Sequence, residues 1–377
     1  MSVWDSLIGQ PNAVSTLQRA VEGTSHAMTH AWLFTGPPGS GRSVAARGFA
    51  AALQCESGGC GQCRACTTSL AGSHPDVTVV RTEKLSIGIE EVRDLVRRAA
   101  MSPTMGRWQT IIIEDSDRIT ERGANALLKG IEEPGAKTVW MLCTPTANDV
   151  VATVRSRCRQ VSLVTPSQEA VTTILMGEGI PESKARFAAR VCQGHIGRAR
   201  AVATNPDVAV RRKEILDIPG KLQNLGGCLE AASWAISTAQ DEASGATKQL
   251  DAEEKEQLST VLGIVKGKPL PRGAAGPMKE LEEQQGLRAK RLVRDRLDSI
   301  LLELTGYYRD VLMVQTGNSE NLVNTDYRKA IEKTASQSGP EMTIRRIDAI
   351  SDCGLALARN VAPLLAFEAM LVSLSSL

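Results

Sequence analysis

The sequence carries almost no net charge, because 44 Lys and Arg residues stand against 42 Asp and Glu residues and leave a formal charge of +2. Any contact with nucleic acid therefore has to come from local basic patches and not from a field around the whole chain. No apolar run approaches the ~18 residues of a membrane span, and residues 1–5 contain no basic segment that leads into an apolar stretch. These absences favour a cytoplasmic protein without a membrane partner.

Cysteine is not scarce, but it is unevenly distributed. Four of the nine cysteines lie between Cys55 and Cys66, and the other five are scattered singly among apolar neighbours. In a reducing compartment such clustering indicates a metal site and not a set of disulfides. The length of 377 residues suggests two or three domains, at roughly 100–200 residues each.

The clustered cysteines are Cys55, Cys60, Cys63 and Cys66, with four, two and two residues between them. Paired C-x-x-C steps turn neighbouring thiolates onto one tetrahedral ion, and the glycines at 58, 59 and 61 permit the tight turns that this requires. Four thiolates leave no open position for water, so we expect a structural Zn²⁺ that holds an insertion at 55–66 together. The alternative, a set of buried free thiols, is disfavoured by the regular spacing.

A glycine-rich stretch at 36–43, Gly-Pro-Pro-Gly-Ser-Gly-Arg-Ser, follows an apolar run and precedes a helix-forming segment. This order is typical of a phosphate-binding loop, in which backbone N–H groups surround phosphates and a Lys reaches their terminal oxygens. Arg42 stands where that Lys belongs, and its planar guanidinium cannot sit as an ammonium does between two phosphoryl groups. The alternative is a simple turn between strand and helix. We expect an impaired nucleotide site formed by Gly36, Gly39, Ser40, Gly41, Arg42 and Ser43.

Apolar runs alternate with helical patterns over the first 164 residues. The five runs are Trp32–Thr35, Val77–Arg81, Thr110–Glu114, Val139–Cys143 and Val161–Val164. Such alternation predicts an α/β domain with a parallel sheet covered by helices on both faces. Because ligands of open parallel sheets lie beyond the carboxyl ends of the strands, the residues that follow each run are candidates for a site.

Acidic residues follow the third run. Nucleotide-hydrolysing sites place a metal-binding acid here, and the next acid positions the attacking water. If Glu114 takes the metal position it is too long, and Asp115 is too short for the water. If the register shifts by one, Asp115 takes the metal and Ser116 cannot act as a base. Both registers predict poor hydrolysis, while Asp117 is either part of this site or a cap of the next helix.

Two further candidates lie near the end of this domain. Thr144 ends the fourth run, where a polar side chain could face a γ-phosphate. Arg155, Arg157 and Arg159 stand close together before the last run, and a solvated cluster is the ordinary interpretation of such a group. A rigidly held arginine beside apolar residues is also what an arginine finger requires.

Together these stretches resemble the bacterial sliding-clamp loader of DNA polymerase III, an AAA+ family. The resemblance rests on the 36–43 loop, the Cys55–Cys66 module, His74-Pro75-Asp76, Asn125-Ala-Leu-Leu-Lys129 followed by Glu132-Glu133-Pro134, and Ser156-Arg157-Cys158. It is dense from about Gly9 to Gly197 and thin afterwards. It implies an AAA+ domain at 1–164 with a five-stranded parallel sheet, a helical lid at 165–208, and an all-α collar at 209–377 that joins five subunits into a ring.

The resemblance also implies roles. Arg157 would be a finger offered in trans to the ATP of a neighbouring motor subunit of the gamma/tau type. Delta-type subunits, the sliding clamp and primer-template DNA would be the other partners, at replication forks in the bacterial cytoplasm. Arg42 and the Glu114-Asp115 order match the ring subunit that does not hydrolyse ATP, so any ATP or ADP in its own site would stay intact. Arg198 stands where AAA+ lids place a sensor arginine, with a plain surface arginine as the alternative.

The second half of the sequence is helical in pattern. We expect Thr165 to cap the first helix of the lid, with Pro166 at its first position. A break is expected at 266–277, where prolines and glycines gather, and a single final helix at 342–374 with surplus apolar surface for a subunit interface. The basic stretch 288–296 is either a DNA contact or, as interspersed acids favour, a solvated helix face.

Two other functions compete with a non-hydrolysing ring subunit. One is an ATP-hydrolysing motor subunit of the same loader or another AAA+ remodeller, in which Arg42 would have to serve as the missing Lys. The other is a zinc-dependent nucleic-acid-binding protein, which the near-zero net charge and the single arginine within the cysteine cluster disfavour.

Overall fold

The computed structural model describes residues 2–23, 27–82, 86–264, 271 and 273–375. The chain divides into two compact units, Met1–Thr204 and Asn205–Leu377. The predicted boundaries at 164/165 and 208/209 stay predictions. Among the described residues, no helix combines the length and the apolar character that a membrane span needs.

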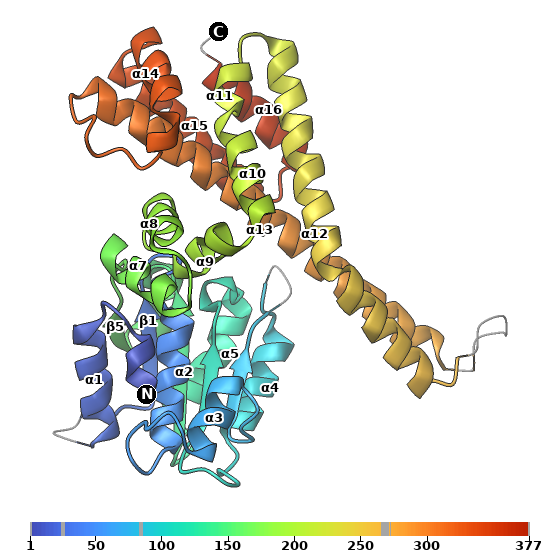
Figure 1. The fold of residues 1–377 in the computed structure, drawn as a ribbon. Helices are drawn as coiled ribbons and strands as arrows, with labels where there is room; N and C mark the ends of the chain where they lie inside the picture. Colours follow the sequence, from blue (N-terminus) through green and yellow to red (C-terminus); the bar gives the residue numbers. More distant parts are fainter. Residues whose placement is uncertain (1, 24–26, 83–85, 265–270, 272, 376–377) are drawn as a thin grey trace. The chain divides into compact units, whose positions relative to one another are not determined.

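The first unit is formed around one sheet, which has five parallel strands among the described residues (Figure 1). The strands are β1 (Ala31–Thr35), β2 (Val77–Val80), β3 (Gln109–Ile113), β4 (Thr138–Thr144) and β5 (Arg159–Ser162). Their order is β2-β3-β4-β1-β5, and Thr35 at the end of β1 pairs with Thr144 at the end of β4. The five predicted apolar runs are therefore confirmed, although β5 begins two residues before the predicted run.

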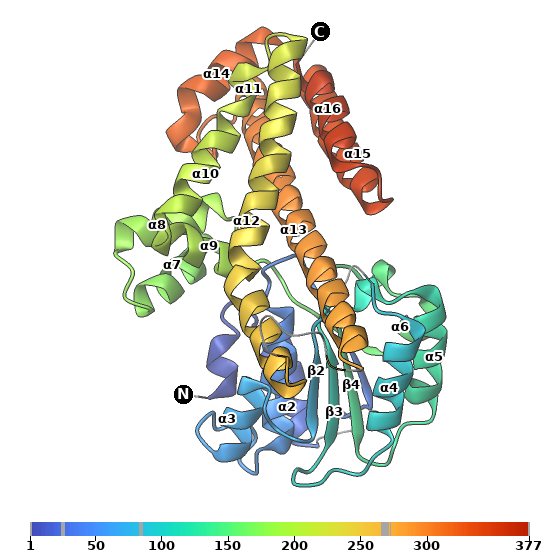
Figure 2. The same ribbon diagram turned by 90° about the vertical axis from the view of Figure 1, so that its right-hand side faces the viewer.

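Helices cover both faces of this sheet, as Figure 2 shows. One face packs α1 (Pro11–Val21) and α2 (Arg42–Gln54) against side chains such as Trp32 and Phe34. The other packs α4 (Ile89–Ala99) and α5 (Glu121–Glu132) against neighbours that point the opposite way, such as Leu33. Strands buried on both faces explain why the runs are continuously apolar and not alternating. Shorter elements are η1 (Val3–Ser6), α3 (Arg64–Ala71), η2 (Ser116–Arg118), η3 (Ala147–Asp149) and α6 (Ala152–Arg155).

Three helices follow the sheet within the first unit and share a small core of their own. They are α7 (Gln168–Gly177), α8 (Glu182–Val191) and α9 (Ile196–Thr204). The predicted cap of α7 was wrong, because Ser167 and not Thr165 accepts a hydrogen bond, from the N–H of Ala170. Thr165 and Pro166 stay outside the helix, where their atoms lie against the Cα of Gly194.

In its described residues the second unit is built from helices. They are α10 (Pro206–Leu216), α11 (Ile218–Lys221), α12 (Leu225–Val261), α13 (Ala275–Gln315), η4 (Thr325–Tyr327), α14 (Arg328–Gln337), α15 (Pro340–Ala358) and α16 (Pro363–Leu374). The all-α prediction is confirmed. The single final helix was wrong, because α15 ends at Ala358, Asn360 takes a left-handed backbone conformation with φ of 61°, and Pro363 begins a new helix.

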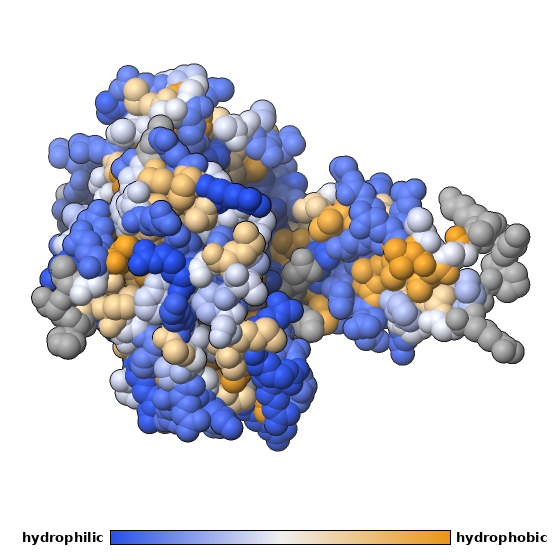
Figure 3. Space-filling view, turned by 90° about the horizontal axis from the view of Figure 1, so that it is seen from below, coloured by the Kyte–Doolittle hydropathy of each residue, from blue (hydrophilic) through white to orange (hydrophobic). Residues whose placement is uncertain are grey.

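The helices α12 and α13 form a long antiparallel hairpin. Half of the predicted break at 266–277, residues 266–270 and 272, lies outside the described residues, and α13 begins at Ala275 within the predicted range. Figure 3 shows apolar side chains gathered on the far part of this hairpin, where Leu250 and Val261 are exposed. The basic stretch lies on α13 and is paired with acids. Arg288 contacts Asp251 and Glu254, which supports the solvated-face interpretation.

Candidate nucleotide and metal sites

The glycine-rich loop connects β1 to α2, as the sequence predicted. Gly41 precedes the first helical residue, Arg42, and takes a left-handed conformation with φ of 92° that a side chain would strain. The hydroxyl of Ser40 is buried and has no hydrogen-bond partner among the described residues. A glycine-rich turn that leads into a helix N-terminus is the arrangement that a phosphate-binding loop requires.

A residue that the sequence analysis missed closes over this loop. His195, before the start of α9, lies so near that a Cβ on Gly39 would be 2.5 Å from its ring. The backbone N–H of Arg198 donates to Nδ1 of His195 over 3.3 Å. Burial lowers the pKa of His195, and the charges of Arg198 and Arg42 lower it further. The one sequence signal was its position, three residues before the candidate sensor arginine.

Arg42 is turned back onto its own loop. Its Nη1 donates to the carbonyl oxygen of Gly36 over 2.6 Å. Burial lowers the pKa of the guanidinium, and the nearby groups Cys143, Asp117 and Asp115 oppose that shift. The guanidinium thus satisfies a loop carbonyl instead of reaching out as the missing Lys would.

The acids after β3 point in different directions. Glu114 forms an ion pair with Arg47 of α2 at 2.8 Å, whereas Asp115 lies within the electrostatic reach of Arg42. The hydroxyl of Ser116 donates to the Cys143 carbonyl over 2.7 Å. This arrangement corresponds to the shifted register, in which Asp115 faces the loop and a serine stands in place of the base.

The remaining candidates near the loop contact the chain itself. Asp117 is in η2, and burial raises its pKa; the cap of α5 is Thr120, whose Oγ1 accepts from Gly123. The hydroxyl of Thr144 is buried and donates to the carbonyl of Thr146 over 3.1 Å. Asp115, Thr144 and the loop therefore lie at the carboxyl edge of the sheet, where Arg42 and Thr144 bond to the chain itself and the Ser40 hydroxyl has no partner among the described residues.

The three clustered arginines differ in their surroundings. Arg159 donates to the Ala27 carbonyl over 2.6 Å and lies over the Trp32 ring, and Arg155 donates to the Ala147 carbonyl. Both side chains are half-buried against their own unit. Arg157 has a 42% exposed side chain and pairs with Glu132 at 2.6 Å.

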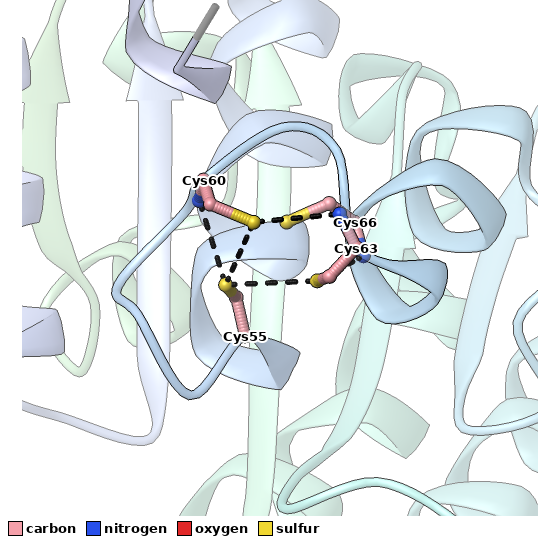
Figure 4. Close-up of side chains that lie close together, drawn as sticks. All are labelled: Cys55, Cys60, Cys63 and Cys66. Atoms are coloured by element: carbon pink, nitrogen blue, oxygen red, sulfur yellow. Dashed lines mark hydrogen bonds between the residues drawn. The ribbon is translucent and has the colours of Figure 1, made fainter.

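The four clustered cysteines converge at the other end of α2 (Figure 4). All four sulfur atoms lie within 4.8 Å of one another, and Sγ of Cys55 is 3.7 Å from those of Cys60 and Cys63. Metal–sulfur bonds of about 2.3 Å at a tetrahedral ion place the sulfurs ~3.8 Å apart. The donor set and its geometry therefore fit a closed tetrathiolate metal site.

Backbone groups support the thiolates. The N–H groups of Cys60, Cys63 and Cys66 each point at the sulfur of the preceding cysteine over 3.4 Å. Burial opposes ionisation of Cys55, but hydrogen bonds from the backbone of Cys60 and its neighbours outweigh it and lower the pKa of Cys55 to about 6. Such contacts orient ligands and stabilise their charged form.

The N-terminal segment holds the cysteine loop. Val3 donates its backbone N–H to Gly59 over 3.0 Å, and the indole of Trp4 donates to Gly58 over 3.2 Å. Gly59 has a φ of 109°, and a Cβ there would lie 2.6 Å from Val3. Both the backbone conformation and the contact with Val3 therefore require glycine at position 59.

The sheet order β2-β3-β4-β1-β5, the glycine-rich loop after β1 and the three helices that follow give the predicted arrangement, a parallel α/β domain followed by helices. Residues 9–167 match the family model described as DNA polymerase III, delta subunit. The chain is similar to several DNA polymerase III delta-prime subunits. It is 25% identical to the Bacillus subtilis subunit delta-prime over 93% of this chain and 92% of that protein.

Other relatives are more similar in sequence but match less of this chain. The subunit delta-prime of Pseudomonas aeruginosa is 35% identical over 37% of this chain, and the match spans less than half, 45%, of that protein. The subunit delta-prime of Escherichia coli is 33% identical over 46% of this chain and 54% of its own length. A solved DNA polymerase III gamma-subunit-related protein of Thermotoga maritima covers 97% of this chain and 99% of its own at 17% identity, with a TM-score of 0.39.

Proposed function

We propose that this chain is a non-hydrolysing subunit of the clamp-loader ring of the replicative polymerase. In this role it supplies Arg157 to the ATP of a neighbouring subunit. Similarity to delta-prime subunits supports a place in that complex. The observation that carries the finger role is the contrast among the three arginines, of which Arg157 alone has an exposed side chain.

Arg157 is suited to act across an interface. It follows α6 directly, and its Nη1 donates to the Thr153 carbonyl over 2.9 Å. Glu132, which ends α5, holds the other terminal nitrogen in an exposed ion pair. An exposed pair of this kind contributes little stability, so a γ-phosphate can replace Glu132 as partner of the guanidinium.

The chain's own loop is a poor catalyst. Arg42 contacts the carbonyl of Gly36, Glu114 is paired with Arg47, and Ser116 follows Asp115 where a base is needed. Hydrolysis requires a cation on the terminal phosphates, a metal-binding acid and a positioned water together. Any ATP or ADP held by this loop would therefore remain intact, with Arg198 of α9 as the nearest lid arginine.

The partners follow from the same role. Some relatives of this chain are named subunit tau or gamma/tau of DNA polymerase III. Subunits of this type would receive Arg157, and delta-type subunits would complete a five-membered ring. The helical unit would be the collar of the ring, and exposed apolar residues such as Leu355 and Leu365 suit its contacts with neighbours. The ring would load the sliding clamp onto primer-template DNA.

The cysteine cluster would hold one structural Zn²⁺. Four cysteine ligands form a closed shell, so the ion would bind no water and would perform no chemistry. Its task would be to hold together a loop that has too few apolar residues for a core of its own.

The finger role is tested with reconstituted rings. Rings that contain Arg157→Ala should hydrolyse ATP more slowly in the presence of primed DNA and clamp, but not stop, because one interface receives this arginine. Arg155→Ala is the matched control, since Arg155 contacts its own unit. Equal steady-state rates for wild-type and Arg157→Ala rings would reject the role.

The motor-subunit alternative is tested on the isolated chain. The proposed role predicts negligible ATP turnover by the purified wild-type protein. Turnover that depends on Asp115 would favour the motor subunit instead.

A further inference from the structure

A cavity of about 420 Å³ lies in the second unit, among α11, α13, α14, α15 and α16. These helices gather at one end of that unit, as the two ribbon views show. Tyr307, Tyr308 and Leu374 supply apolar wall, and Arg346 and Lys333 supply positive charge. Asp217 is the acidic residue of the wall, and its Oδ1 accepts a hydrogen bond from the Tyr327 hydroxyl over 3.1 Å. The volume is within the range of pockets that hold small molecules.

Arg346 is the unusual group in this wall. Its side chain is 5% exposed, its Nη1 donates to the hydroxyl of Ser338 over 2.9 Å, and the guanidinium lies over the Tyr308 ring. Its Nε is buried without a hydrogen-bond partner, and no carboxylate pairs with Arg346 among the described residues. A buried charge without a counter-ion is unfavourable in a protein interior.

A second buried arginine of the same unit shows the usual solution. Arg212 is also 5% exposed and its Nε also makes no hydrogen bond among the described residues, but its guanidinium is paired with Asp326 at 2.9 Å and Glu303 at 3.6 Å and donates to the side-chain oxygen of Asn324. The two arginines also differ in position, because Arg346 lines the cavity and Arg212 does not. The counter-charge of Arg346 can therefore come from a molecule in the cavity.

We propose that this pocket binds a small organic oxyanion, a carboxylate or a phosphate ester, with Arg346 as its principal cation. A guanidinium offers a planar set of N–H donors that matches two oxygens of such a group. Lys333 adds an exposed positive charge at the mouth, and the tyrosine rings and Leu374 cover the carbon part of the ligand. The site is separate from the phosphate loop and goes beyond the proposed role of this chain in the ring.

The test uses the full chain with its zinc and two probes, inorganic phosphate and succinate, at constant ionic strength maintained with sodium chloride. Saturable binding followed by NMR shifts of labelled arginine and tyrosine side chains is expected for at least one probe. Arg346→Lys and Lys333→Gln should weaken that binding, the former by about tenfold or more, as loss of charge-assisted hydrogen bonds does.

Arg345→Gln is the matched control, because Arg345 is the exposed neighbour on the same helix and should leave the affinity unchanged. Lys333→Gln keeps the test decisive if Arg346→Lys does not fold, since Lys333 is exposed. Absence of saturable binding of both probes would overturn the proposal. It would also fail if Lys333→Gln, Arg346→Lys and Arg345→Gln bound the probes as the wild type does.

Discussion

Helix α2 has a glycine-rich loop at each end, and the two loops use their polar groups differently. At its start, Arg42 bonds the carbonyl of Gly36 and His195 covers Gly39. At its end, the thiols of four cysteines face one another and receive backbone N–H groups. Glycines in both loops set the backbone shape, but the side chains decide whether a ligand is expected. Arg42 at one end contacts its own loop, whereas the four thiols at the other end fit a metal ion.

Removal of the metal should have the largest effect. Chelation, or Cys63→Ser, should release about one zinc per chain and abolish hydrogen-exchange protection in 54–69, because metal binding supplies the folding energy of such loops. Elemental analysis and hydrogen exchange measure both results. Cys158→Ser, a half-buried cysteine outside the cluster, should keep the zinc. Carefully purified wild-type protein without zinc would contradict this account of the α2 end.

A buried carboxylate also lies near the cysteine-bearing end of α2. Asp76 is 2% exposed and accepts hydrogen bonds from Thr104, Met105 and Gly106, while Gln54 of α2 accepts from Arg107. Asp76→Ala should lower the free energy of unfolding by about 2–4 kcal/mol, since it leaves several buried donors unsatisfied. Urea unfolding at pH 7 measures this, with the exposed Asp94→Ala as control.

The same carboxylate gives a pH dependence. Burial raises the pKa of Asp76, but the bonds from Thr104 and its neighbours outweigh this and lower it to about 2. Because the pKa of Asp76 is depressed in the folded protein, its carboxylate stabilises the fold at pH values above the pKa of the unfolded chain, about 4. This stabilisation is lost as the pH falls towards 2. The stability gap between wild type and Asp76→Asn should therefore narrow below pH 4. A gap that widens there would contradict the assignment.

A pair of glycine substitutions sharpens the comparison at the cysteine loop. Gly59→Ala combines a left-handed backbone with a 2.6 Å contact to Val3, whereas Gly58→Ala, with φ of 67°, meets nothing closer than 3.7 Å. Gly59→Ala should cost about 2–3 kcal/mol and Gly58→Ala about 1 kcal/mol. Thermal unfolding of the two zinc-loaded variants separates the clash from backbone strain, and equal losses would argue against the packing described.

The smallest effect is expected at the other end of α2. Arg42→Lys restores the residue type of a working loop, yet it should not confer ATP turnover, because Glu114 stays paired with Arg47 and Ser116 stays beside Asp115. A phosphate-release assay on the isolated variant measures this. Turnover above the wild-type background would mean that Arg42 alone silences the loop.

Much of the fold was predictable from local pattern. The continuous apolar runs predicted the parallel sheet because both of its faces are buried, and the cysteine spacing predicted the cluster because its ligands are close in sequence. The break after α15 was also predictable, because a proline such as Pro363 is unfavourable inside a helix. A single helix was predicted because the apolar repeat continues past this proline. The error at Thr165 arose because Thr165 and Ser167 are both residue types that can cap the N-terminus of α7.

Contacts between distant residues were not predictable in the same way. Gly39 and His195 are brought together by the packing of α7, α8 and α9 within the first unit, which no spacing indicates. Arg159 donates to the Ala27 carbonyl and lies over the Trp32 ring. The sequence shows only an arginine in a basic cluster and does not indicate these contacts. The exposure of Arg157 could be found only after the partners of its two neighbours were known.

The central claim is that Arg157 acts on a neighbour's ATP, and single-turnover hydrolysis by the assembled ring tests it most directly. Rings with wild-type chain, Arg157→Ala or Arg157→Lys would be loaded with ATP, mixed with primed DNA and clamp, and quenched on the millisecond scale. We predict that Arg157→Ala slows one fraction of the sites by up to ~10³-fold or more and leaves the others unchanged, and that Arg157→Lys rescues it poorly. Identical time courses for all three rings would contradict the claim and leave Arg157 as a surface partner of Glu132.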